Sequence, residues 1–202
     1  MEHGDEQFTG KYEASGRIGG WLIDNFYTSV LSLLASQSGV TRSILEVGCG
    51  AGYSTQRIRE RIPAATTLEA CDISDSLVEK ARMRNPGVPV STGSVYGLSH
   101  ADASVDGIVM LEVLEHLDEP QKALRELHRV CEKYVVLSTP REPVWRGLNM
   151  ARGRYLRDFG NTPGHVQHWS SRALRREVST RFDVLAMRQP LPWTVLLLAP
   201  KR

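Results

Sequence analysis

Short apolar runs alternate with amphipathic stretches along most of the chain. Apolar runs predict buried strands at residues 44–47, 66–72, 88–92, 105–111 and 134–138. Apolar residues at helical spacing predict helices at 53–62, after Ser74, after Asp118 and at 170–178. Strands that alternate with helices form a mostly parallel sheet with helices on both faces. The pattern therefore predicts an α/β, doubly wound fold.

A further helix is expected before the first strand. Apolar residues fall at helical spacing between Trp21 and Leu34, and Gly39 offers a stop. We expect residues 1–40 to form a helical cap over the sheet or over a cofactor cleft.

The last quarter of the chain departs from the alternation. Two strand-like runs, 182–188 and 193–199, are too close together for a crossover helix between them. We therefore expect an antiparallel hairpin at the end of the sheet. Residues 141–168 show little regular pattern, and Pro140 is expected to stop the pairing of the strand before them.

Two helix starts carry capping residues. Ser74 precedes an apolar helical stretch and is expected to act as its N-cap. Asp118 is followed by Pro120 and, three residues after the aspartate, by Gln121. This spacing predicts a capping box with a proline in the first turn.

The strand at 44–47 runs directly into three alternate glycines, Gly48, Gly50 and Gly52. Glycines there let the backbone turn sharply and approach a ligand, as at a nucleotide-type cofactor site. A dinucleotide fingerprint needs its last glycine one position later, where this chain has Tyr53. The carboxylate of Glu46 would repel a pyrophosphate and suits a cationic or amine-bearing ligand. The pattern thus disfavours a nicotinamide cofactor.

Composition is consistent with one domain over residues 1–202. The chain has 41% hydrophobic residues and a formal net charge of +2. The three cysteines, Cys49, Cys71 and Cys131, have no metal-binding spacing and are expected to be reduced, partly buried thiols. No apolar run is long enough to span a bilayer, and the acidic first residues do not resemble a signal peptide. We expect a cytoplasmic protein.

The glycine segment closely resembles motif I of the class I S-adenosylmethionine-dependent methyltransferases. A second stretch, residues 112–117 (Glu-Val-Leu-Glu-His-Leu), matches a run typical of the small-molecule branch that includes the ubiquinone O-methyltransferases. The resemblance covers residues 40 to 140 well. It implies a Rossmann-like, seven-stranded sheet with a C-terminal antiparallel hairpin strand, and S-adenosylmethionine as the methyl donor.

The resemblance also implies which residues hold the cofactor. Glu46 and the glycines would lie at its methionine part, and Leu111 would face the same arm. Asp72 stands where the family has its ribose-binding acid, followed by Ile73. Many relatives have an adenine-binding acid where this chain has Ser94; the serine hydroxyl and the N–H of Val95 can still reach the ring nitrogens.

Methyl transfer to a hydroxyl requires a base near the cofactor. The candidates for the catalytic residue are His116, His165 and His168. Glu112 and Glu115, with His116 and either His165 or His168, match the divalent metal site of coenzyme Q O-methyltransferases and of small-RNA ribose methyltransferases. The same run is widespread in relatives without metal, so we favour a general base and no metal.

Residues 141–168 are the expected substrate lid, because the family shapes its acceptor pocket there. Residues 141–181 contain nine arginines and three acids, and aromatic residues are interleaved with the arginines. Such a lid suits an anionic or aromatic small molecule, although a solvated basic segment fits the pattern equally well.

We expect methyl transfer to a small molecule, with a hydroxyl oxygen favoured over nitrogen or carbon. The first alternative is methylation of RNA at a ribose or a base, which the nearly neutral overall charge disfavours. The second is a non-catalytic partner subunit that binds the cofactor. We expect no DNA partner and no membrane partner, and a homodimer is compatible with the sequence.

Overall fold

The computed structural model describes residues 17–153 and 155–202. Their strands form one sheet in the order β3-β2-β1-β4-β5-β7-β6. The strands are β1 (Ser43–Val47), β2 (Thr67–Asp72), β3 (Val90–Thr92), β4 (Val105–Leu111), β5 (Cys131–Pro140), β6 (Phe182–Arg188) and β7 (Trp193–Pro200). Strands β1 to β5 pair in parallel, whereas β7 is antiparallel to both β5 and β6. The predicted seven-stranded sheet with an antiparallel hairpin is confirmed.

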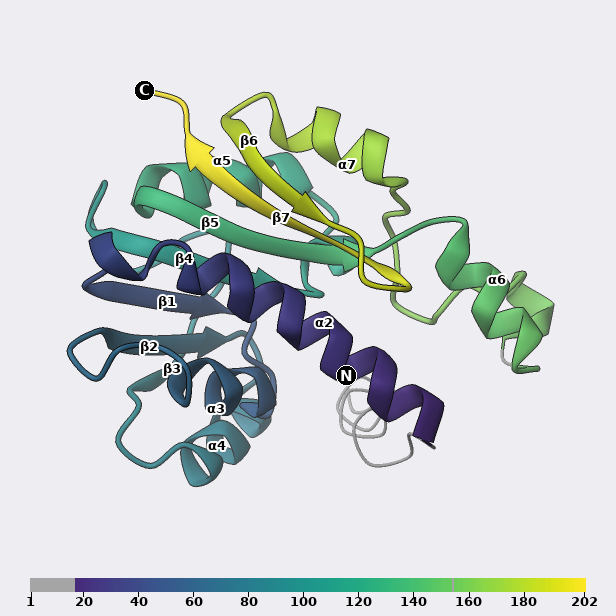
Figure 1. Cartoon of the computed structure of the whole chain (residues 1–202), viewed down its shortest axis with the longest axis horizontal. Helices are drawn as coiled ribbons and strands as arrows, with labels where there is room; N and C mark the ends of the chain where they lie inside the picture. Colours follow the sequence, from purple (N-terminus) through teal and green to yellow (C-terminus); the bar gives the residue numbers. More distant parts are fainter. Residues whose placement is uncertain (1–16, 154) are drawn as a thin grey trace.

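Helices cover both faces of this sheet (Figure 1). They are α2 (Arg17–Ala35), α3 (Tyr53–Arg59), α4 (Asp75–Arg84), α5 (Pro120–Val130), α6 (Val144–Ala151) and α7 (Ser171–Val178). Helices α2, α3 and α4 pack on one face, and α5 and α7 pack on the other. Short 3-10 turns are η1 (Ser38–Val40), η2 (Leu114–His116) and η3 (Leu156–Asp158). No helix of the described residues is long and apolar enough to cross a membrane.

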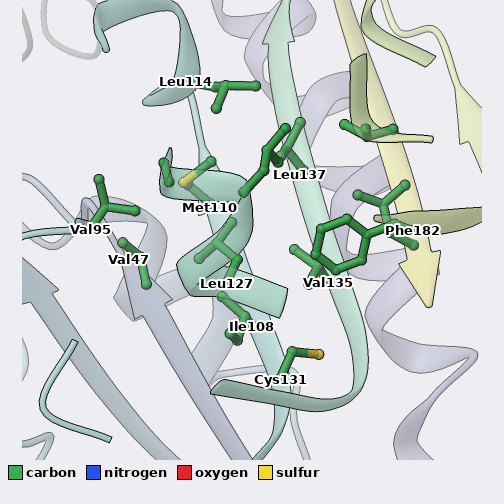
Figure 2. Packing of buried hydrophobic residues seen from close by; sticks show 14 of the residues in the cluster. Val47, Val95, Ile108, Met110, Leu114, Leu127, Cys131, Val135, Leu137 and Phe182 are labelled. Atoms are coloured by element: carbon green, nitrogen blue, oxygen red, sulfur yellow. The ribbon is translucent and has the colours of Figure 1, made fainter. Parts of the chain in front are cut away.

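Strand β4 is the centre of the core. All seven of its residues are buried, and successive side chains point to opposite faces of the sheet. Ile108 and Met110 pack toward Leu127 of α5, with Leu114 above them (Figure 2). Val109 and Leu111 point to the opposite face of the sheet, where they belong to the hydrophobic cluster that packs under α2. A strand buried on both faces is expected to be mostly apolar, and the one charged residue of β4, Asp106, pairs with Lys133 at 2.7 Å.

Both serine caps are formed. The hydroxyl of Ser74 accepts a hydrogen bond from the N–H of Leu77, and that of Ser170 accepts from Ala173. The capping box at the start of α5 is absent, because Gln121 donates instead to the Glu177 carboxylate of α7 at 2.8 Å. This bond between helices withdraws the side chain that the box needs.

The segment after β5 also differs from the prediction. Pairing continues to Pro140, which lies opposite Trp193 of β7. Strand β4 already ends opposite Ser138, so a proline here has only one neighbouring strand. Residues 144–151, expected to be irregular, form α6. Only Asn149 of this helix is buried, and Trp145 and Asn149 both contact Thr162. The helix therefore lacks the buried apolar stripe by which a helix is recognised in a sequence.

A substitution at Gly107 tests how tightly β4 and β5 are packed. A Cβ atom at this position would overlap the Tyr134 ring on the neighbouring strand. We expect Gly107→Ala to lower the free energy of unfolding by about 1–3 kcal/mol, as overpacked cores do. Gly147→Ala in α6 is the control, since nothing lies within 4 Å of its added Cβ, and it should be neutral or stabilise by up to about 1 kcal/mol. Urea denaturation measures both; equal midpoints for the two variants would contradict the packing argument.

Candidate active site at the carboxyl edge of the sheet

The glycine loop joins β1 to α3 and is enclosed by protein on two sides. Gly48, Gly50 and Gly52 have φ angles of 77°, 54° and 81°, which side-chain-bearing residues rarely adopt. A Cβ on Gly48 would also overlap Val113, and one on Gly52 would overlap the amide of Asn85. The glycines thus let the loop fit between the turn after β4 and the end of α4.

Asp72, the last residue of β2, faces this loop. Its Oδ2 accepts a hydrogen bond from the N–H of Gly50 at 2.8 Å, and its Oδ1 accepts from the N–H of Ser74 at 3.0 Å. Each carboxylate oxygen has two acceptor sites, so each retains one. The bonds fix the carboxylate and leave it able to accept two further hydroxyl donors.

Glu46 lies behind the loop. The side chain is 1% exposed, and its Oε2 accepts a hydrogen bond from the Thr55 hydroxyl of α3 at 2.5 Å. Burial raises the pKa of Glu46 to about 7, against the lowering effect of that hydrogen bond. The carboxyl group therefore braces the first turn of α3 from inside the protein.

Arg84 and Asn85, at the end of α4, hold the outer side of the loop. The Arg84 guanidinium lies 3.5 Å from the centre of the Tyr53 ring and donates to the carbonyl of Ala51 at 2.5 Å. Asn85 is buried and donates to the carbonyl of Gly52 at 2.9 Å. The sequence analysis missed both residues, because nothing in their spacing along α4 signals a contact with a loop more than 30 positions earlier.

The other residues expected at the cofactor lie at the ends of neighbouring strands. Ile73, directly after β2, is 74% exposed, which is unusual for a large apolar side chain at a strand end. The Ser94 hydroxyl accepts from the N–H of Tyr96, so it is partly engaged within its own turn. Val95 and Leu111 are 8% and 6% exposed and pack into the core.

Residues 164–167, which we call the strap, cross over the turn that follows β4. The N–H groups of the last two strap residues donate to the carbonyl oxygen of Glu115 at 2.9 and 3.0 Å. Nδ1 of His116 lies 2.9 Å from the carbonyl oxygen of Gly164. A carbonyl can only accept, so Nδ1 carries the hydrogen and the ring lone pair of neutral His116 is on Nε2.

The strap brings together three of the predicted side chains. One ligand atom each from Glu115, His116 and His165 lies within 4.8 Å of the other two. Glu115 is 1% exposed and His165 is 5% exposed, and the two histidine rings meet edge to face with centres 4.8 Å apart. We call these three residues the triad. A carboxylate beside two imidazoles can move a proton or hold a divalent cation.

Two of the predicted residues do not join the triad. Glu112, at a left-handed φ of 59°, accepts from the Trp193 indole at 2.7 Å and from the Ser138 hydroxyl at 3.1 Å. Its carboxylate is thus directed to β5 and β7. His168 is exposed, and its Nε2 lies 2.7 Å from the side-chain oxygen of Asn161.

Aromatic rings connect the triad to both ends of the chain. Trp145 of α6 stacks on His165 at 5.9 Å between ring centres, and it contacts Trp193 of β7 at 5.8 Å. Trp193 in turn contacts Phe26 of α2 at 4.9 Å. The sequence analysis named His165 as a candidate base and counted Trp145 among the aromatic residues of the lid, but it did not anticipate the contacts with Trp193 and Phe26. The contacts join positions up to 167 residues apart, and no local pattern reveals them.

Known proteins resemble the middle part of this chain. Residues 45–137 match a family described as a methyltransferase domain. A probable S-adenosylmethionine-dependent methyltransferase of Mycobacterium tuberculosis is 36% identical over 101 residues, 49% of this chain and 36% of that protein. A demethylmenaquinone methyltransferase of Paenarthrobacter aurescens is 30% identical over 114 residues, 54% of this chain and 44% of that protein. The chain thus spans less than half the length of these relatives.

The fold has a solved counterpart along nearly its whole length. Magnesium protoporphyrin IX methyltransferase from Synechocystis, solved with bound SAH, superposes with a TM-score of 0.73. The alignment covers 98% of this chain and 95% of that one at 15% sequence identity. At this identity the likeness establishes a shared fold, and it confirms the Rossmann-like architecture.

The buried Glu46 predicts a pH-dependent stability. Above pH 4.5 the unfolded chain loses this proton, whereas the folded chain keeps it until about pH 7. The free energy of unfolding should therefore fall by about 3 kcal/mol through this site as pH rises from 4.5 to above 7. Glu46→Gln keeps an oxygen that can accept from Thr55, and it removes the titrating group. Over the same rise in pH, its free energy of unfolding relative to that of wild type should therefore increase by that amount.

Urea denaturation at pH 5 and pH 8 measures this difference, and Glu60→Gln on the surface is the control. Parallel pH profiles for wild type and Glu46→Gln would show that Glu46 is already ionised in the folded protein.

Proposed function

We propose that this chain, which carries a class I S-adenosylmethionine-dependent methyltransferase domain, transfers the methyl group of S-adenosylmethionine to a hydroxyl oxygen of a small-molecule acceptor. The observation that carries the proposal is the triad, which stands next to the glycine loop because Gly48 packs directly against Val113. This proximity supports a donor and a proton acceptor at the same edge of the sheet, where open α/β sheets bind their ligands.

The donor site fits S-adenosylmethionine. Asp72 retains two acceptor positions for the two ribose hydroxyls. The exposed Ile73 beside it offers an apolar surface for the adenine ring. Glu46 acts from behind the loop, as a positioning residue, since its carboxyl contacts Thr55. The donor supplies a methyl group that is already activated on a positively charged sulfur.

The acceptor side needs a group that takes up the hydroxyl proton. In neutral His116 the lone pair lies on Nε2, because Nδ1 donates to the strap carbonyl. We assign the general base to this atom. As the oxygen attacks the methyl carbon, the carbon–sulfur bond breaks and the hydroxyl proton passes to His116. The adjacent Glu115 carboxylate stabilises the imidazolium that results.

A divalent metal ion is the second candidate for the same position. The compact grouping of one carboxylate and two imidazoles favours it specifically. Glu115, His116 and His165 would hold the ion, and Glu112 would not, since Trp193 and Ser138 engage its carboxylate. A bound cation would lower the pKa of an acceptor hydroxyl.

Ile73 gives a clean test of donor binding, because its side chain is 74% exposed and contributes little to the core. We expect Ile73→Ser to weaken S-adenosylhomocysteine binding about fivefold, as loss of roughly 1 kcal/mol of apolar contact. Met83→Ser is the matched control at 75% exposure and should bind like wild type. Isothermal titration calorimetry measures both affinities; equal affinity in the two variants removes Ile73 from the site.

Activity is tested by incubating the protein with labelled S-adenosylmethionine, pooled metabolites and, separately, RNA. We expect a labelled small molecule. His116→Gln should lower the rate at least 100-fold, because the general base is missing. His128→Gln, in the last turn of α5 beside Phe182, should retain the wild-type rate. Full activity after EDTA supports the base, whereas loss that Mg²⁺ or Mn²⁺ restores supports the metal. Labelled RNA alone, or cofactor binding with no product, overturns the proposal.

A further inference from the structure

Residues 144–153 and 155–160, which we call the tip, project from the body of the protein (Figure 1). Figure 1 shows α6 at one end of the long axis, beyond the carboxyl ends of the strands. The inner side of the tip faces the rest of the site. There the Trp145 indole and the Asn149 amide both donate to the Thr162 hydroxyl, at 2.9 and 3.2 Å.

The outer side of the tip exposes large apolar side chains. Met150, Leu156 and Phe159 are 41%, 60% and 71% exposed. Arg146 links two of them, because its Nε donates to the carbonyl of Phe159 at 2.8 Å and Met150 follows Arg146 by one helical turn. Side chains this exposed contribute little to the core.

Arginines accompany the apolar residues along the tip, and Glu142 contributes a negative charge beside Arg146. Arg146, Arg152 and Arg157 form no ion pair with any acid of the described residues. The tip has a single acidic residue, Asp158, so its charge is strongly positive. This surface combines cationic side chains with large exposed apolar side chains. Clusters of exposed apolar side chains are rare on protein surfaces that bind no partner.

The first turn of α2 adds to the same end of the molecule. Ile18 and Trp21 are 75% and 62% exposed, next to the cationic Arg17. Figure 1 shows this end of α2 toward the same end of the long axis as α6. Tryptophan is the side chain best suited to the boundary between lipid and water.

We infer that the tip, together with the first turn of α2, docks this protein on the surface of an anionic lipid bilayer. Arginines bind the lipid phosphates, and the apolar side chains enter the headgroup region. An acidic protein partner fits the charge but requires about 800 Å² of complementary surface on each side. A narrow projecting segment suits insertion among lipid headgroups better than such an interface.

This inference goes beyond the proposed function and does not depend on it. It also departs from our expectation that the protein has no membrane partner. That expectation rested on the lack of a membrane-spanning run, whereas peripheral docking needs only a charged and partly apolar patch. The patch became visible when the structure placed Met150, Leu156 and Phe159 at the surface of the protein.

Sedimentation with vesicles tests the inference. We expect the full chain to bind vesicles of 30% phosphatidylglycerol in phosphatidylcholine, to bind pure phosphatidylcholine at least tenfold more weakly, and to be released by salt. Arg152→Gln combined with Arg157→Gln should lower the partition coefficient by roughly 10- to 30-fold. Leu156→Ser combined with Phe159→Ser should lower it at least fivefold.

Matched variants outside the tip provide the controls. Arg172→Gln with Arg175→Gln removes two exposed charges from α7, and Met83→Ser removes an exposed apolar side chain from α4. Both should change binding by less than twofold, and thermal melting verifies that every variant is folded. Absence of wild-type binding to the anionic vesicles overturns the inference. An equal loss of vesicle binding in the two arginine double variants, of the tip and of α7, also overturns it. The same holds if the protein binds a polyglutamate or RNA probe and does not bind vesicles.

Discussion

The carbonyl oxygen of Glu115 is the point on which the site depends. It accepts two backbone N–H groups from the strap, about 50 residues later in the chain. Backbone bonds of this kind tolerate changes of side chain, so the arrangement survives sequence variation at the strap. These bonds hold the strap against the turn after β4 and so keep His165 beside His116.

The parts of the fold that the sequence predicted are those set by local rules. Strands such as β4 are largely apolar because both their faces are buried. Asp72 and Ile73 could be located because a parallel sheet presents the ends of its strands at a single edge. The turn at Gly48 was recognisable because only glycine tolerates its backbone angle and its contact with Val113.

The parts that escaped prediction depend on distant contacts. Arg84 and Asn85 brace the glycine loop from α4, and Trp193 engages Glu112 across 81 positions. No periodic pattern encodes such pairs. The E-x-x-E-H spacing suggested that both glutamates face one metal, but a left-handed backbone at Glu112 directs its side chain elsewhere. A motif specifies residue types, whereas the backbone decides where each side chain points.

The attachment of the tip has an evolutionary consequence. On one side the N–H of Glu142 donates to the carbonyl of Trp169 at 2.9 Å, and on the other side the strap is held by Glu115. The chain between these anchors leaves and re-enters the body at fixed positions. Segments of other lengths and compositions can therefore be exchanged there without disturbing the glycine loop, since longer excursions between fixed ends cost little free energy. A change of this one segment would alter the surface beside the triad and leave the sheet as it is.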